Sequence, residues 1–133
     1  FCLAADDVVV VTTPEMPAFS EAYGLIKLLQ SKGFAHTPHL MVSMANSAEE
    51  AEETARRIRL VARRFLRMEI DSWGWVPCDP AIPSSVRRQE PVMTAFPQSP
   101  AALVYRSLAA RLWTAPQPDP DRSLPSTKQR LQA

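Results

Sequence analysis

Glycine is scarce in this 133-residue sequence, and its three glycines, Gly24, Gly33 and Gly74, each stand alone. The chain therefore contains neither G-x-x-x-x-G-K-[ST] nor G-x-G-x-x-G, the two glycine-rich loops whose backbone N–H groups hold phosphates. No serine or cysteine stands in a nucleophile elbow. These 133 residues thus carry no recognisable machinery of their own for hydrolysing a triphosphate.

Side chains that bind metals are equally few. Cys2 and Cys78 lie far apart, and His36 and His39 share one short segment between elements. A zinc site needs clustered ligands, so we expect no metal site. Both cysteines are expected to be packed thiols, and both histidines are expected to face solvent.

Net charge and long apolar runs are also nearly absent. The formal net charge is +1, which favours neither nucleic acid nor an anionic membrane as a direct partner. No apolar run approaches the roughly 20 residues that span a bilayer. Phe1–Ala5 is too short and lacks the basic flank of a signal peptide. We therefore expect a cytoplasmic protein.

Three apolar runs predict strands, at Val8–Val11, Leu40–Met44 and Ile70–Val76. Continuous β-branched runs are typical of strands buried on both faces of a parallel sheet. Helical patterns separate them: Pro17 to Lys32, a long helix capped by Ser47, a short helix around Ser84–Gln89, and a last helix from Ser99-Pro100 to about Trp113. The predicted fold class is α/β, a parallel sheet with flanking helices.

The long central helix has an apolar face and a charged one. Its apolar face is formed by Ala51, Ala55, Ile58, Ala62 and Phe65. Its glutamates come first and its arginines last, which suits the helix dipole, and Glu52–Arg56 and Glu53–Arg57 have the spacing of ion pairs. We interpret the charges as a solvated face. Trp73 and Trp75 are interpreted as packing residues in preference to a base-stacking platform.

The two ends of the chain suggest an incomplete unit. The sequence starts at Phe1 without an initiator methionine, and three strands leave buried-type edges unpaired, so we expect a missing N-terminal segment and self-association. Residues 114–133 are polar and proline-rich, and we expect a disordered tail beyond a domain that covers residues 1–113.

Short polar or proline-fixed segments follow each predicted strand: Thr12–Glu15, Ser43–Asn46 and Pro77–Pro80. In an open α/β sheet, ligands bind outside the carboxyl ends of the strands. The three segments are therefore the candidate binding rim, although each is also consistent with a simple loop.

The same segments resemble a known family. Ala5-Asp6-Asp7-Val8-Val9-Val10-Val11-Thr12-Thr13-Pro14-Glu15 resembles the A-D-E-x-x-V-V-T-x-P-E strand and loop of MinD/ParA-type ATPases. Ala22–Lys27, Val76–Pro80, Val86–Val92 and Ser99–Ala102 resemble, in order, motifs of the branch that controls flagellar number and placement (FlhG/FleN). The likeness runs from Phe1 to about Trp113 and implies the C-terminal half of a P-loop NTPase fold.

The resemblance implies a role for the rim. In this family the C-terminal half supplies an adenine pocket, and the residues implied to flank the base are Ser43, Met44, Pro77, Cys78 and Asp79. ATP or ADP, with Mg²⁺, is implied for the intact protein, together with weak ATPase activity. This chain alone is expected to bind no nucleotide tightly.

Family position 43 commonly holds asparagine, whose amide pairs with the adenine edge. Ser43 offers a single hydroxyl and cannot make that paired contact. Asn46 lies nearby, but its offset from the strand end makes it a poor substitute. Binding here is therefore expected to be weak, water-mediated or lost.

The family also implies ATP-dependent dimers, regulatory partners of the flagellar or positioning machinery, and a peripheral place at the inner membrane. The end of this chain offers Leu131 as its single large apolar anchor, so membrane binding through it is not supported. Two alternatives stay open: a non-catalytic interaction domain derived from the same fold, and another nucleotide or flavin binder that has lost its phosphate loop.

Overall fold

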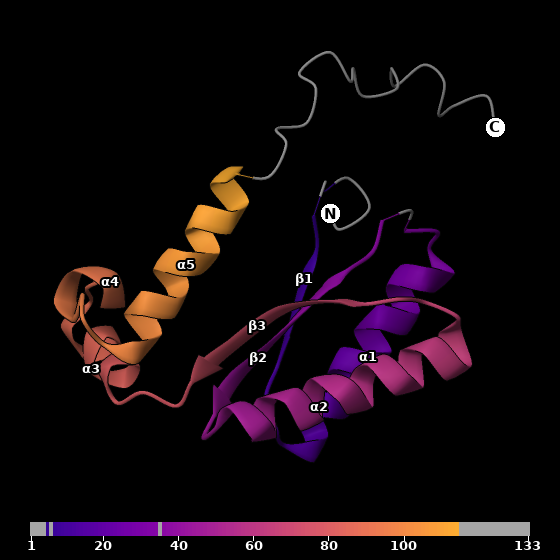
Figure 1. Cartoon of the computed structure of the whole chain (residues 1–133), viewed down its shortest axis with the longest axis horizontal. Coiled ribbons are helices and arrows are strands. Elements are labelled where there is room, and N and C mark those ends of the chain that lie inside the picture. Colours follow the sequence, from indigo (N-terminus) through magenta and orange to yellow (C-terminus); the bar gives the residue numbers. More distant parts are fainter. Residues whose placement is uncertain (1–4, 6, 35, 115–133) are drawn as a thin grey trace, which may run out of the picture.

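The computed structural model describes residues 5, 7–34 and 36–114, and Figure 1 shows their arrangement. Three strands, β1 (Val9–Thr12), β2 (His39–Ala45) and β3 (Asp71–Pro77), form one parallel sheet in the order β1-β2-β3. The remaining elements are α1 (Met16–Ser31), α2 (Ala48–Val61), the π-helix η2 (Ala62–Leu66), α3 (Ala81–Arg88), α4 (Val92–Ala95) and α5 (Pro100–Thr114). The predicted α/β class is confirmed, and the architecture is consistent with a P-loop NTPase-like fold.

The expectations for Cys2, Phe1–Ala4 and the tail at 114–133 fall outside the described residues, except that Thr114 ends α5. The short helix α4 was not predicted. No helix in the described part is long and apolar enough to cross a membrane.

The core lies between the sheet and the pair α1 and α2, which pack together on one side of the strands (Figure 1). Buried side chains on this side alternate with more exposed ones along β1 and the first part of β2, because successive side chains of a strand point to opposite faces. Val10, Leu40 and Val42 are essentially inaccessible to solvent, and Ile26 and Ile58 meet them from the helices. Fully burying side chains of this size stabilises a fold by about 1.5–3 kcal/mol each, so this layer carries most of the stability.

A wide turn at the end of α2 changes which side chains reach the core. Ala51, Ala55, Ile58 and Ala62 are buried as predicted, but Phe65 is 65% exposed. The π-helix at 62–66 widens the turn, so Leu66 packs inward in place of Phe65. The prediction for Phe65 was therefore wrong, because it assumed an uninterrupted α-helical period.

The charged face of α2 is exposed, as interpreted, but its ion pairs differ from the predicted ones. Glu53 pairs with Arg56 at 2.8 Å, Glu52 reaches Arg59, and Arg63 pairs with Glu69 at 2.8 Å. The predicted Glu52–Arg56 and Glu53–Arg57 pairs do not form. Exposed pairs of this kind add little to the stability of the fold and mainly keep the face solvated.

The second face of the sheet is only partly covered within the described residues. The helix α5 packs against β3, away from α1 and α2 (Figure 1). The Trp73 ring lies against His39, with centroids 4.6 Å apart, and the Arg111 guanidinium lies 5.6 Å from the Trp73 ring centroid. Trp75 packs on the core side, so both tryptophans act as packing residues. Beyond α5, Val11 of β1 remains 53% exposed.

At the amino end of β2, the His39 ring lies between two carboxylates. Its Nε2 lies 3.3 Å from the Asp7 carboxylate and its Nδ1 lies 3.3 Å from the Asp71 carboxylate. The His39 side chain is 17% exposed. The expectation that both histidines face solvent was right for His36 and wrong for His39, because β2 begins one residue earlier than predicted.

Candidate functional site

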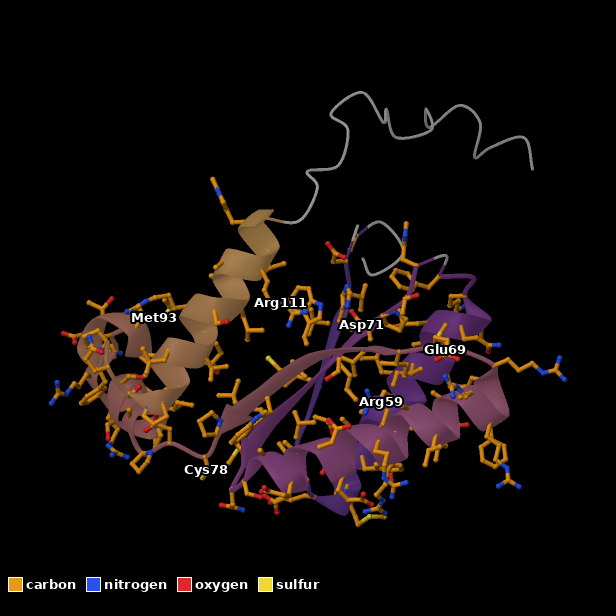
Figure 2. All side chains as sticks on the ribbon, in the orientation of Figure 1. Arg59, Glu69, Asp71, Cys78, Met93 and Arg111 are labelled. Carbon is orange, nitrogen blue, oxygen red and sulfur yellow. The ribbon has the colours of Figure 1, made fainter. Side chains whose placement is uncertain are left out.

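The carboxyl ends of the strands bring the three predicted rim segments to one edge of the sheet. Since all three strands are parallel, Thr12–Glu15, Ser43–Asn46 and Pro77–Pro80 leave the sheet at the same edge. Cavities connect each segment to its neighbour. Cys78 marks this edge in Figure 2, and Asp71 and Arg111 lie toward the opposite end of the strands.

The larger of these cavities, which we call the rim cavity, has a volume of about 470 Å³. This volume lies within the range of about 300–1,000 Å³ typical of small-molecule sites. Three prolines give it rigid, flat and apolar walls. The rim cavity is lined by Met44, Asn46, Pro77, Cys78, Asp79, Pro80, Ile82 and Pro83.

Met44 reaches the cavity because β2 is irregular at its end. Ser43 pairs with Val76 and Ala45 pairs with Pro77, so Met44 is an extra residue with no partner in β3. Its φ of 60° lies in the left-handed region, which costs an L-residue roughly 1–2 kcal/mol. The side chain is 57% exposed at the cavity edge. Strained bulges of this kind concentrate next to binding sites, where they aim a side chain.

The bulge also exchanges the expected positions of Ser43 and Asn46. Ser43 is not among the residues that line the rim cavity, whereas Asn46 is. The expectation that Asn46 is badly offset from the strand end rested on sequence spacing alone, whereas Asn46 lines the rim cavity beyond the bulge at Met44. No signal in the sequence marks this bulge, since it depends on pairing with β3.

A carboxylate fixes the orientation of the Asn46 side chain. Glu50 Oε2 accepts hydrogen bonds from the Asn46 backbone N–H at 2.6 Å and from its Nδ2 at 3.1 Å. An ionised carboxylate can only accept, so the amide nitrogen must face Glu50. Glu50 is placed by the predicted cap, in which its own N–H donates to Ser47 Oγ at 3.2 Å. The Asn46 amide oxygen is therefore the end that can accept from a ligand.

Asp79 lines the rim cavity, and its carboxylate binds the N-termini of two helices. Oδ1 accepts from the Ala81 N–H at 2.8 Å, and Oδ2 accepts from the Ala101 N–H at 2.9 Å. The Ala101 N–H, followed by the Ala81 N–H, lowers the pKa of the Asp79 carboxyl. Asp79 therefore joins the first turns of α3 and α5.

The expectation that Cys78 is a packed thiol was wrong. The thiol is exposed, not packed, because β3 ends at Pro77 and the chain then turns outward around the cavity. The Cys78 N–H donates to the Ala45 carbonyl at 2.9 Å, which holds this turn against β2. The thiol is thus accessible at the cavity wall.

A smaller cavity of about 190 Å³, which we call the polar cavity, continues the rim toward β1. It shares Met44 and Asn46 with the rim cavity. The hydroxyl of Thr13 is buried and has no hydrogen-bond partner in the described part of the chain. Carboxylates of Glu15 and Glu50 add negative charge, so this cavity favours neutral hydroxyl donors and disfavours phosphate. The polar cavity is lined by Thr13, Pro14, Glu15, Met44, Asn46 and Glu50.

A third cavity, of about 290 Å³, lies on α2 away from the rim and is lined by Arg56, Arg59, Leu60, Arg63, Glu69 and Ile70. Its three guanidiniums already bind carboxylates of Glu53, Glu52 and Glu69. This arginine cavity therefore offers little uncompensated charge for an anion. Among the described residues, no group of three histidine, cysteine, aspartate or glutamate side chains is arranged to hold a metal ion.

Comparison with known proteins gives one informative match. No protein-family model matches the chain. The chain is 30% identical over 118 residues to Antiactivator FleN of Pseudomonas aeruginosa, and the alignment covers 89% of this chain and 42% of FleN. The chain therefore spans less than half the length of this relative. The resemblance to the FlhG/FleN branch of MinD/ParA-type ATPases, read from the motifs, is confirmed.

Proposed function

From this similarity to FleN, we propose that the chain forms the base-binding part of a MinD-like, ATP-dependent regulatory switch that controls flagellar number or placement. The observation that carries the proposal is the rim cavity, whose position outside parallel strands is where open α/β sheets bind ligands. In the proposed arrangement the adenine of ATP or ADP occupies this cavity. The phosphates and Mg²⁺ are held by a phosphate loop that these 133 residues do not contain.

The walls of the rim cavity suit a purine. Pro77, Pro80 and Pro83 present rigid apolar surfaces, and Ile82 adds a branched side chain. Proline rings are already fixed in conformation, so they lose little entropy when a flat ring packs on them. Met44 closes the edge toward β1 with a polarizable thioether, which makes favourable contacts with aromatic rings.

Asn46 supplies the polar contact that distinguishes adenine. Its amide oxygen accepts a hydrogen bond from the N6 amine of adenine, a donor that hypoxanthine replaces with a carbonyl. Because Glu50 holds the amide nitrogen, the side chain cannot simply turn over to suit the other base. Asn46 thus takes the part that asparagine at position 43 has in the family, because Asn46 lines the rim cavity and Ser43 does not.

The polar cavity extends this site toward the sugar. It borders the rim cavity at Met44 and Asn46, on the side of β1. Ribose hydroxyls are neutral donors, and carboxylates accept from them in many dinucleotide sites. Glu15 and Glu50 therefore suit the ribose and keep the negatively charged phosphates farther along the rim.

The test measures affinity of the whole chain for adenosine and inosine by titration calorimetry or NMR. The wild type should prefer adenosine, and Asn46→Ala should lose about 2- to 10-fold in adenosine affinity, the range expected for one net hydrogen bond of about 0.5–1.5 kcal/mol. Glu50→Gln frees the Asn46 amide to turn over. The preference for adenosine over inosine should therefore fall more than the affinity for adenosine itself. Ser43→Ala is the matched control and should change neither. An adenosine affinity that depends on Ser43 and not on Asn46 would overturn the base-reading role, and no binding would overturn the function.

A second candidate, a non-catalytic interaction domain, is favoured by the partly uncovered sheet face. Val11 is 53% exposed on β1, and β1 is an edge strand among the described residues. Parallel strands are almost always covered on both faces. We propose that this face associates with a second copy when nothing else covers it. Sedimentation should show that the wild type is a dimer and that Val11→Lys is a monomer. The control variant Leu60→Lys, on α2, should remain a dimer.

A further inference from the structure

Asp79 occupies a position where the rim cavity meets two helices. Asp79 follows β3 and lines the cavity, next to Cys78 and Pro80. Its carboxylate turns away and accepts one N–H from each of two helix N-termini, at Ala81 and at Ala101. The two helices start 19 residues apart in the sequence, at Ala81 and at Pro100. One side chain therefore links the wall of the cavity to α5.

Both N–H groups are donors that lack partners within their own helices. The first four N–H groups of an α-helix need acceptors from outside it, and a carboxylate also interacts favourably with the positive end of the helix dipole. Ala101 is completely buried, so water cannot replace Asp79 as its acceptor. Ser99 supports the same helix end, since its Oγ accepts from the Ala102 N–H at 3.2 Å and its side chain also hydrogen-bonds the Asp79 carboxylate.

The helix α3 belongs to the same unit, because its first turn also lines the cavity. Ile82 and Pro83 form part of the cavity wall. The Ile82 N–H donates to the Asp79 carbonyl at 3.1 Å, so this turn moves with Asp79. A ligand that packs against Pro80, Ile82 and Pro83 thus restrains the backbone whose carboxylate holds α5.

At its other end, α5 is attached to the sheet. Arg111 donates to the Trp73 carbonyl at 3.0 Å and lies over the Trp73 ring. Figure 2 shows Arg111 directed from α5 toward the strands. The helix is therefore held at its N-terminus by Asp79 and Ser99 and near its C-terminus through Trp73. Near that C-terminus, Leu112 is 47% exposed and Trp113 is 82% exposed.

We infer that Asp79 is a positioning residue that couples occupation of the rim cavity to the docking of α5, without touching the bound base through its carboxylate. The inference rests on the proposed function, since it requires a base in the cavity. A ligand that tightens the Asp79 loop strengthens the hold on Ala101, and a docked α5 in turn favours ligand binding. This reciprocity is a thermodynamic requirement of any such coupling.

The experiment follows amide hydrogen exchange at Ala101 and Ala102 in the whole chain, with and without saturating adenosine. Adenosine should slow exchange at both amides in the wild type. Asp79→Ala should abolish the slowing at both and lower adenosine affinity about 5-fold, the lower end of typical coupling. Asp79→Asn keeps one acceptor oxygen, so it should retain part of the effect and preserves the fold if the alanine variant unfolds.

Ser99→Ala is the matched control. It removes the hydroxyl that bonds Ala102 and contacts the Asp79 carboxylate, but leaves both backbone N–H bonds of Asp79 in place. Exchange at Ala102 should then be faster both with and without adenosine, and adenosine should still slow exchange at Ala101. A purely structural Asp79 would behave like Ser99, with faster exchange but an unchanged response to adenosine.

The possible outcomes distinguish the coupling through Asp79 from the proposed base-binding function. Wild-type chain that binds adenosine without any change at Ala101 overturns the coupling and leaves the proposed function standing. Equal slowing in wild type and in Asp79→Asn and Asp79→Ala also overturns it. Wild-type chain that binds no adenosine overturns the proposed function, and the coupling with it, because the coupling needs an occupied cavity.

Discussion

The strained backbone at Met44 predicts that glycine is more stabilising than alanine at this position, the reverse of the usual order. Alanine and glycine are compared at this position, so that both variants lack the thioether and differ only in the Cβ atom. Since φ is 60°, alanine keeps the left-handed strain of roughly 1–2 kcal/mol, which glycine does not have. Glycine loses about 0.5–1 kcal/mol more in backbone entropy on folding. The Met44→Gly variant should therefore be more stable than Met44→Ala by about 0.5–1 kcal/mol.

Leu28 provides the matched position for this comparison. It is 52% exposed, close to the 57% of Met44, but it lies inside the α-helix α1. There the order should reverse, and Leu28→Gly should be less stable than Leu28→Ala by about 0.5–1 kcal/mol. Urea unfolding followed by tryptophan fluorescence measures all four variants.

The two Met44 variants should also share a defect in binding. Without the thioether, both should bind adenosine more weakly than the wild type, whatever their stability. Met44→Ala proving as stable as Met44→Gly would show that the backbone at the end of β2 is regular. The bulge could then no longer account for the presence of Asn46 in the lining of the rim cavity.

Three further predictions concern the same edge of the sheet. The lowered pKa of Asp79 means that its bonds to Ala101 and Ala81 stabilise the fold above the ordinary aspartate pKa of about 3.9 and are lost as pH falls through the lower folded pKa. Asp79→Asn should therefore be less stable than wild type near neutral pH. Urea unfolding should show that this difference in stability becomes smaller in acid. A difference that grows in acid would contradict the role given to the Asp79 carboxylate. In a Cys2→Ser background, saturating adenosine should slow alkylation of exposed Cys78 by iodoacetamide, and an unchanged rate would place the ligand elsewhere. Ser47→Ala should cost about 0.5–2 kcal/mol in thermal or urea unfolding, and no loss would mean that the cap of α2 is not formed in solution.

The larger part of the fold could be predicted from local patterns. Three β-branched or apolar runs gave three parallel strands, because a strand buried among helices needs no polar alternation. The Ser47 cap and the Ser99-Pro100 start of α5 were also predictable, since both depend on residues within a single turn. The three rim segments followed from strand order alone.

The details that shape the rim cavity depend on contacts distant in the sequence. The bulge at Met44 arises from pairing with β3, so the places of Ser43 and Asn46 could not be read from their spacing. Asp79 was expected to flank the base, but its carboxylate binds the N–H of Ala101, 22 residues later. The wide turn at 62–66 likewise reversed the positions of Phe65 and Leu66.

The exposure of Cys78 and the burial of His39 have a common cause. Both residues lie at strand ends, where a shift of one residue in the boundary decides whether a side chain points into a layer or away from it. Such shifts follow from packing of the whole sheet. They are therefore invisible to patterns that consider one segment at a time.

The most direct test of the account is an amide NMR titration of the whole chain with adenosine. Base binding in the rim cavity predicts chemical-shift changes that concentrate at Met44, Asn46, Cys78 and Asp79, with little change at Arg56 and Arg63 of the arginine cavity. Shifts confined to the arginine cavity, or no shifts at millimolar adenosine, would contradict the assignment of the rim cavity as a base-binding site.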